Sequence, residues 1–438
     1  GPLSPEGMRA ALLTRSNEIQ LAMVAESARW GDAKVGTPYT RDSWRAAFTG
    51  VWNSFVPTRT TVLINQLKAD GLFPTVNAPL FNSYGGVVSN GLVFTKSNNN
   101  GTGTLYYTTD GTDPRVRGGA ISPTAIAYTP GTPIIINFPT VIRARIRSGT
   151  TWSAINEATF YPAQDFSRLR VTEIMYNPPT FGLSPGDEVE FIELKNTGAS
   201  VIDLGGMSFT DGITFTFTNR TRLQPGEFFV LARNTSMVAT KYPGIAVNGI
   251  YTGRLDNGGE VLTLSSPLGT EVLSFGYKDG GRWPVAPDGF DFSLVPRAGA
   301  GSANPGNPSY WRASSNPGGS PGADDPELVI PGIVINEALT HTDPPLVDYI
   351  ELHNPTPYAV DLSGWFLTDN SGIPDKFRIP QNTVIDPGGY AVFTEADFNP
   401  TPGLNNSFTL DSHGEQVYLL SGDSDSPALT GYSHGFSF

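Results

Sequence analysis

The stretch Val171-Thr172-Glu173-Ile174-Met175, followed after a Pro/Gly-rich loop by Glu190-Phe191-Ile192-Glu193-Leu194-Lys195-Asn196, occurs twice in this chain. The second copy, about 160 residues further along, reads Ile335-Asn336-Glu337-Ala338-Leu339 and then Asp348-Tyr349-Ile350-Glu351-Leu352-His353-Asn354. Both stretches are short, apolar and rich in β-branched and aromatic residues, and turn-forming residues bound them, which is typical of β-strands. The chain therefore carries a duplicated β-domain.

Four further blocks match between the copies and keep their order. Each contains Gly, Asp or Pro-Gly, the residues that form tight turns between strands. The blocks in the first copy are 203–206, 209–211, 223–228 and 255–261, and those in the second copy are 361–364, 367–369, 385–390 and 410–417. Six matched blocks in one order indicate a repeated sandwich of short strands rather than a chance similarity.

The composition of the 438 residues limits the class of protein. Typical domain sizes predict about three or four domains. There is no Cys, which excludes disulfides, thiol nucleophiles and zinc-thiolate sites. No run of 18 apolar residues is present, so we expect no membrane-spanning helix.

The net charge of −13 is distributed unevenly. Residues 1–162 carry 14 Lys and Arg against 9 Asp and Glu, whereas residues 328–438 carry 2 against 14. Binding to a nucleic acid backbone needs a basic surface, so no nucleic acid partner is expected. The acidic end fits calcium, a cationic partner or a solvated surface.

The pattern along the chain predicts five segments. Residues 1–74 show three helical stretches, at 4–30, from near Thr40, and up to Asp70 before Gly71. Short alternating strands begin at residue 75, and the predicted boundaries are 1–74, 75–162, 163–312, a Pro/Gly linker at 313–327, and 328–438. The abrupt helical start and an incomplete second copy suggest that the chain is part of a longer protein.

Two segments resemble known modules. Residues 25–32, Trp44 and residues 59–74 are similar to the C-terminal end of CotH-type kinase domains, without that family's nucleotide-binding or catalytic core. Leu105-Tyr106-Tyr107-Thr108-Thr109-Asp110-Gly111-Thr112-Asp113-Pro114 resembles the hallmark of the chitobiase/hexosaminidase C-terminal type of Ig-like domain. That resemblance implies a small β-sandwich found beside catalytic domains.

The repeat resembles the lamin-tail domain, an Ig-like β-sandwich, in its Glu-Ile, Phe-Ile-Glu-Leu-x-Asn, Asp-Leu-x-Gly and Pro-Gly blocks. In bacteria such domains accompany CotH-type kinase domains and secreted nucleases as attachment or interaction modules. The expected fold is therefore mainly β, with tandem Ig-like sandwiches behind a short N-terminal three-helix segment.

The strongest candidate site residues are acidic positions that recur in both copies: Glu173, Glu190, Glu193, Glu337, Asp348 and Glu351. If the two strands are neighbours, these carboxylates could share a hard cation such as Ca²⁺, which prefers several oxygen ligands. Paired carboxylates could also act as acid and base, as in glycoside hydrolysis. The alternative is structural, since a carboxylate on a strand often accepts hydrogen bonds from a turn or pairs with Arg.

A second candidate surface is the row Arg143, Arg145 and Arg147. Alternation along residues 141–147 places Ile142, Ala144 and Ile146 toward the core and the arginines on the other face. Such a row could contact an anionic partner or simply keep the sheet soluble.

The resemblances imply a secreted or cell-surface protein of a bacterium, and together with the absence of a catalytic motif they predict a non-catalytic structural or attachment role. Its partner would be protein, either another copy or a different surface component, or extracellular polysaccharide. The basic first half and the acidic end suggest head-to-tail assembly. Two alternatives remain: a carbohydrate-binding accessory region, and the C-terminal part of a larger CotH-like kinase. No cofactor is expected, apart from a possible Ca²⁺.

Overall fold

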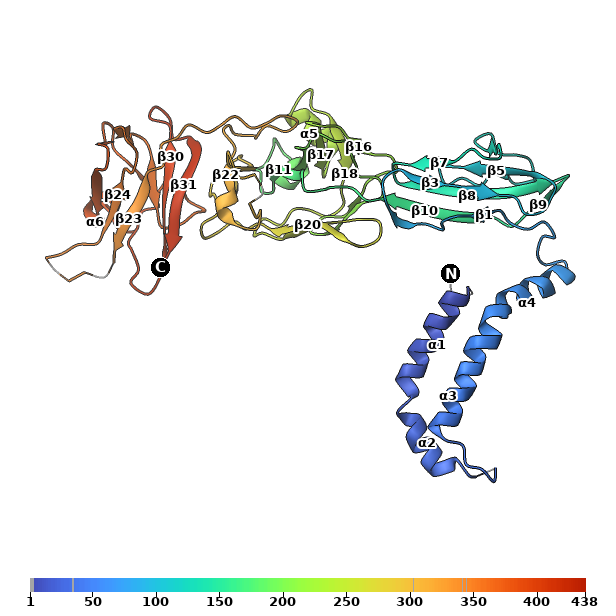
Figure 1. Ribbon diagram of the computed structural model, residues 1–438. Helices are drawn as coiled ribbons and strands as arrows, with labels where there is room; N and C mark the ends of the chain where they lie inside the picture. Colours follow the sequence, from blue (N-terminus) through green and yellow to red (C-terminus); the bar gives the residue numbers. More distant parts are fainter. Residues whose placement is uncertain (1–3, 34, 302, 341, 344) are drawn as a thin grey trace. The chain divides into compact units, whose positions relative to one another are not determined.

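The chain forms two compact units, Gly1–Ala163 and Gln164–Phe438, which are described separately. The computed structural model describes residues 4–33, 35–301, 303–340, 342–343 and 345–438 (Figure 1). Within these ranges the chain is mainly β, with 31 strands and a helical segment at the N-terminal end. The expected fold class is confirmed.

The described residues of the N-terminal segment form four α-helices instead of the predicted three. The first predicted helix divides at Gln20-Leu21 into α1 (Pro5–Ile19) and α2 (Ala22–Trp30). The next two, α3 (Arg41–Gly50) and α4 (Val56–Ala69), form one continuous run through a π-turn at Val51–Phe55. Pro57 does not end this run; it lies directly after the π-turn, where the helical hydrogen-bond pattern changes and the missing N–H of Pro is tolerated.

The rest of the first unit is a β-sandwich with a core of large aromatic and aliphatic residues. Its main sheet has the order β2 (Gly86–Val88), β10 (Asn156–Pro162), β8 (Thr140–Ser148), β5 (Thr104–Thr108), β6 (Ile126–Ala127), and β9 (Thr151–Trp152) pairs with β8. Facing it are the pairs β3 (Leu92–Phe94) with β7 (Ile134–Ile136) and β1 (Leu80–Phe81) with β4 (Lys96–Ser97). The predicted alternation in β8 is confirmed, since Ile142, Ala144 and Ile146 have no solvent exposure.

In the second unit, the first copy of the repeat (residues 164–326) packs two sheets around one core. One sheet has the order β18 (Val247–Ile250), β17 (Phe228–Ala232), β12 (Phe191–Asn196), β11 (Leu169–Met175), β21 (Leu294–Pro296), β22 (Trp311–Ala313). The other has the order β15 (Phe215–Thr216), β14 (Ser208–Asp211), β19 (Val261–Ser265), β20 (Glu271–Gly276), and β13 (Ile202–Asp203) pairs with β16 (Arg222–Leu223). Helix α5 (Thr235–Lys241) lies between β17 and β18 in the chain.

The second copy (residues 327–438) repeats this plan with fewer strands. Its sheets have the orders β23 (Val334–Leu339), β24 (Tyr349–His353), β29 (Tyr390–Thr394) and β27 (Phe377–Arg378), β26 (Phe366–Thr368), β30 (Gln416–Gly422), β31 (Leu429–Ser437). The short pair β25 (Val360–Asp361) with β28 (Val384–Ile385) and helix α6 (Glu395–Phe398) complete it. In this copy β23 is an edge strand, whereas its counterpart β11 is followed by β21 and β22.

The repeated sequence blocks specify turns through buried polar side chains. Asn196 and Asn354, at the ends of β12 and β24, are fully buried, and each donates from Nδ2 to a carbonyl at the start of the Pro-Gly block, Leu223 or Ile385, at 2.9 Å. The backbone carbonyl of each Asn in turn accepts a hydrogen bond from the N–H of the glycine that follows Pro in that block. Since a buried polar group needs its partners, both copies fold back at the same point.

None of the helices in the described residues has the length and apolar character that crossing a membrane would require.

Candidate functional site

Two of the predicted carboxylates, Glu173 and Glu193, lie opposite each other on the paired strands β11 and β12. A bulge at Thr172 shifts the register just before Glu173. Both side chains are about 1% exposed. The two strands are neighbours, which was the condition for a shared site, and two acidic groups meet in the interior of the first repeat.

Both carboxylates accept hydrogen bonds from the segment that connects the repeats. Glu173 Oε1 accepts from Ser293 Oγ at 2.5 Å and from the Ser320 N–H at 2.9 Å. Glu193 accepts from Thr172 Oγ1 at 2.6 Å through Oε1 and from the Gly322 N–H at 2.6 Å through Oε2. Residues 320–322 are therefore fixed to the strand pair through their backbone.

Glu190 is buried in a separate network. Its Oε2 accepts from the Tyr251 hydroxyl at 3.1 Å and from the Leu255 N–H at 2.9 Å. Burial raises the pKa of Glu173 to about 8 and the pKa values of Glu190 and Glu193 to about 7. One oxygen of Glu173 and one of Glu190 accept no hydrogen bond from the described residues.

The corresponding carboxylates of the second repeat are more exposed and have other partners. Glu337 accepts from the Tyr349 hydroxyl at 3.1 Å, and Glu351 accepts from Asn336 Nδ2 at 2.7 Å. Asp348 accepts from Thr342 Oγ1 at 2.8 Å. The difference follows from the edge position of β23, since no counterpart of residues 293–322 covers it in the described chain.

The six acidic positions do not form one group. Among the described residues, no three or more His, Asp or Glu side chains are placed to hold a metal ion. In the first repeat the carboxylates accept hydrogen bonds from hydroxyl and backbone N–H groups, which agrees with the structural role given above as the alternative to metal binding or catalysis. Calcium binding at these positions stays a prediction.

The arginine row of β8 lies opposite the core face, as predicted, and two of its members have local partners. Arg143 forms an ion pair with Glu157 at 2.5 Å, and Arg145 forms a bidentate ion pair with Asp113, with both hydrogen bonds at 2.8 Å. The guanidinium of Arg147 lies 5.7 Å from the ring centre of Trp152. Contact of this row with an anionic partner stays a prediction.

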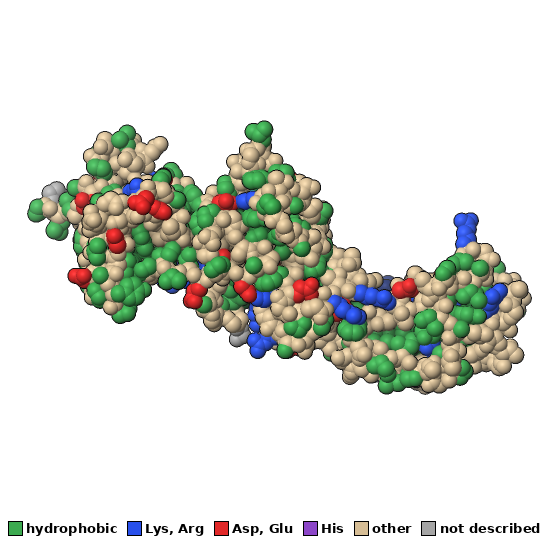
Figure 2. Space-filling model, turned by 90° about the horizontal axis from the view of Figure 1, so that it is seen from above, with side chains coloured by type: hydrophobic (Ala, Val, Ile, Leu, Met, Phe, Trp, Pro, Cys, Tyr) green, Lys and Arg blue, Asp and Glu red, His purple; other side chains and the backbone are tan. Residues whose placement is uncertain are grey.

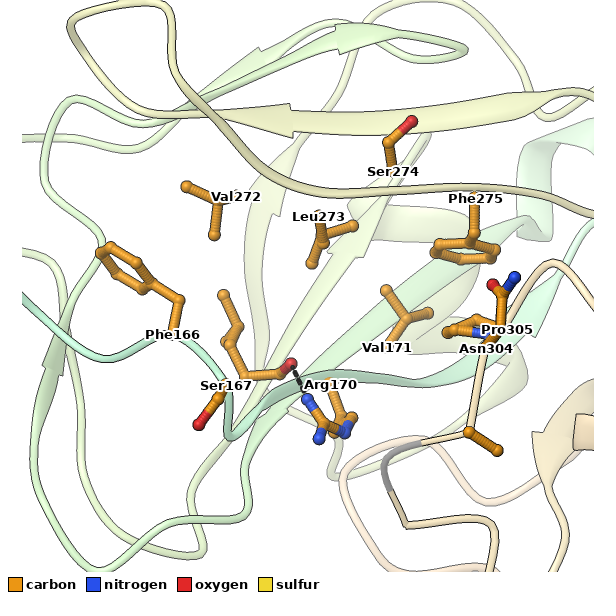
Figure 3. Close-up of a pocket in the computed structure, with 12 residues that line it drawn as sticks. Phe166, Ser167, Arg170, Val171, Val272, Leu273, Ser274, Phe275, Asn304 and Pro305 are labelled. Atoms are coloured by element: carbon orange, nitrogen blue, oxygen red, sulfur yellow. Dashed lines mark hydrogen bonds between the residues drawn. The ribbon is translucent and has the colours of Figure 1, made fainter.

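A pocket of about 340 Å³ opens between β11 and β20 at one edge of the first sandwich (Figure 3). Figure 3 shows Phe166, Val171, Leu273 and Phe275 around it, with the side chain of Arg170 turned back to the Leu169 carbonyl at 3.0 Å. Strand register places His434 at the position of Leu273 in the second repeat, where its Nδ1 accepts the Ile335 N–H at 3.1 Å. The second sandwich is thus closed at the point where the first has an apolar opening.

The outer faces of the two equivalent sheets differ in chemistry. In the first repeat the outward positions of β14 and β19 carry hydroxyls, and these pair in the contacts Ser208–Thr216, Thr210–Ser265 and Thr263–Ser274. Register and sequence place Phe366, Tyr418 and Leu420 at the positions of Ser208, Thr263 and Ser265 in the second repeat. These three apolar side chains are each 1% exposed.

The apolar face is covered by the segment that follows β20 in the first repeat. Val285 packs against Phe366, Tyr418 and Leu420, with Phe290 and Leu429 at the margin. The Val285 N–H also donates to Ser433 Oγ at 3.1 Å. The sequence did not predict this contact between the repeats (the joint), because nothing in the alternation of β26 and β30 marks which apolar residues face outward.

The fold and contacts define a class: two Ig-like β-sandwich modules joined through an apolar contact, behind a separate unit of helices and a further sandwich. The profile of the Lamin Tail Domain family matches residues 162–279 and 327–433. The chain therefore belongs to the lamin tail domain family, and the predicted duplication is confirmed. The resemblances of residues 1–74 and 75–162 stay predictions.

A search of curated proteins gave no significant match. Among solved structures, a DUF4876 family protein of Bacteroides thetaiotaomicron is 12% identical, covers 43% of this chain and 66% of its own, and has a TM-score of 0.18. A surface glycan-binding protein (SGBP-B) from the mixed-linkage glucan utilization locus of Bacteroides ovatus, solved with a mixed-linkage heptasaccharide, is 9% identical. It covers 82% of this chain and 70% of its own, with a TM-score of 0.16. Overlap this low carries no functional argument.

The raised pKa values predict an unusual pH dependence of stability. The folded first repeat keeps protons on Glu173, Glu190 and Glu193 that the unfolded chain, with ordinary values near 4.5, has already released. Unfolding free energy therefore falls as pH rises from about 5 to about 8. In calorimetric scans of the full chain, the unfolding midpoint should fall between pH 5 and pH 8. This fall should be about 5 °C smaller at pH 8 in the double variant E173Q/E193Q.

The matched control is E337Q/E351Q in the second repeat, which should leave the pH profile unchanged. Equal effects of the two double variants would show that burial of the first pair does not cause the dependence.

A second prediction concerns Gly319 in the Pro/Gly-rich segment that connects the repeats (residues 313–327, the connector). Its φ is +74°, and a Cβ there would overlap Glu173 Oε1 and Ser293 Oγ. Gly299 has the same φ with open space around it. Gly299→Ala should cost about 1 kcal/mol for the backbone alone, and Gly319→Ala should cost at least twice as much in urea unfolding. Equal costs would mean that the connector is not held against Glu173.

Proposed function

We propose that this chain is a non-catalytic structural or attachment part of a secreted or cell-surface bacterial protein, in which the paired lamin tail modules act as a rigid spacer. The observation that best supports this proposal is the contact between the two repeats, the joint. Its apolar contact is formed by Val285 and Phe290 from one module and by Phe366, Tyr418 and Leu420 from the other. Large buried apolar contacts between modules restrict their relative motion.

The connector supports the same conclusion, because it is fixed to the first repeat along its length. Arg312 and Asp325 form an ion pair at 2.6 Å with both side chains almost fully buried. Ser315 and Ser320 also donate to the Asp325 carboxylate. The Pro/Gly-rich residues between the repeats are thus part of the first module's surface and leave little free linker.

The surface charge fits an extracellular module that meets basic partners. Residues 164–438 carry 14 Lys and Arg against 32 Asp and Glu. Figure 2 shows the acidic side chains spread over the visible face in small groups. With the net-basic residues 1–162, this distribution supports head-to-tail contact between copies.

The joint is tested by giving the second repeat the residues of the first. The variant F366S/L420S introduces the serines found at Ser208 and Ser265, on a strand framework that already accepts them. We expect both modules to stay folded, but the joint to open, seen as faster proteolysis of residues 313–333 and a broader distance distribution in small-angle scattering. Val384→Ser, at a 54% exposed position of the same repeat, is the control.

If F366S/L420S behaves like Val384→Ser in both measurements, the modules do not depend on this contact and the rigid-spacer proposal fails.

Head-to-tail contact through charge has its own test. Sedimentation of the full chain should show association at low salt that is lost at about 0.5 M NaCl, where the screening length is only a few ångströms. Association that persists at high salt, or a monomer at every salt concentration, would contradict assembly driven by charge.

A further inference from the structure

A cleft of about 660 Å³ lies between the two repeats, beside the apolar joint. The first repeat contributes residues 281–283, Arg297 and residues 307–309, and the second contributes Tyr418 and residues 433–436. Its volume is in the range of small-molecule sites, which often form between domains. The volume of the cleft is several times the volume of an inorganic anion such as sulfate.

The charge of this cleft is opposite to that of its surroundings. No Asp or Glu lines it, although acidic residues outnumber basic ones by more than two to one in this unit. Two arginines, Arg282 and Arg297, contribute to its wall. Neither takes part in an ion pair or side-chain hydrogen bond within the described residues, and burial lowers the pKa of Arg297. An anion here would meet guanidinium groups that have no competing carboxylate.

The other polar groups of the cleft also present hydrogen-bond donors. His434 Nδ1 accepts the Ile335 N–H at 3.1 Å, so the neutral ring carries its hydrogen on Nε2. Burial and the nearby Arg282 lower the pKa of His434, which favours this neutral form. Ser433 Oγ already accepts the Val285 N–H, which leaves its O–H to donate. Asn307 Oδ1 accepts twice from Ser309, which leaves its Nδ2 hydrogens.

The partly buried Phe436 and, deeper in the wall, the buried Trp283 and Tyr418 complete the lining. A ligand that suits these walls is larger than a simple ion, rich in acceptor oxygens, negatively charged and partly apolar along its ring faces. We propose that the cleft between the repeats binds an acidic saccharide, with its carboxylate held by Arg282 and Arg297. This goes beyond a spacer role, since the ligand would contact both modules at once.

The proposal is tested by calorimetric titration of the full chain with tetragalacturonate and with its methyl ester. The two probes share one sugar backbone and differ in charge. We expect the acid to bind and the ester to bind at least tenfold more weakly. The variant R282Q/R297Q should lose at least tenfold in affinity for the acid, whereas R254Q, which removes an equally positive side chain of the first repeat that does not line the cleft, should not.

Unfolding midpoints check that the variants fold, and R282K/R297K keeps the charge if the Gln variant does not fold. It should bind the acid more weakly than the wild type, because Lys lacks the planar fork of Arg. Equal binding of acid and ester, equal losses in R254Q and R282Q/R297Q, or binding of inorganic sulfate without binding of tetragalacturonate would each overturn the proposal.

Discussion

The arrangement of the second unit depends on two carboxyl groups buried beneath a loop. Glu173 and Glu193 meet across β11 and β12 and accept backbone N–H groups from residues 320–322. A buried carboxyl group without donors would be strongly unfavourable, so the connector can take few other paths. By fixing the connector, this pair also fixes where the second repeat begins.

The apolar joint and the connector reinforce each other. The connector keeps the second repeat near residues 283–292, and Val285 then covers Phe366, Tyr418 and Leu420. Two contacts far apart in the sequence thus restrain the same pair of modules, and the cleft with Arg282 and Arg297 lies beside them. A ligand bound there would add a third contact across the same boundary.

Much of the architecture could be predicted from the sequence, because repetition and alternation are local signals. The pairing of the strands that carry Glu173 and Glu193 was a condition of the predicted site, and the facing of Ile142, Ala144 and Ile146 followed from strand periodicity. The burial of those carboxylates did not, because the residues that cover them, such as Ser293 and Ser320, lie more than 100 positions away and have no match in the second copy.

Two other features were outside the reach of local patterns. Asp113, the partner of Arg145, is 32 positions away, and no local pattern links the two residues. Both faces of β26 and β30 are covered, so apolar residues stand at outward as well as inward positions. Such strands show no alternation of polar and apolar residues. In each case the missing information was which distant segment packs on the residue.

The hydroxyl face of the first repeat and the apolar face of the second have a consequence for the history of the duplication. Copies that begin identical have identical faces, and here the core positions have stayed alike while the outward ones have diverged to Ser and Thr on one side and to Phe, Tyr and Leu on the other. The two modules are therefore no longer interchangeable. Exchanging their order would take the segment with Val285 away from the apolar face and leave that face in water, so the chain has acquired a fixed direction.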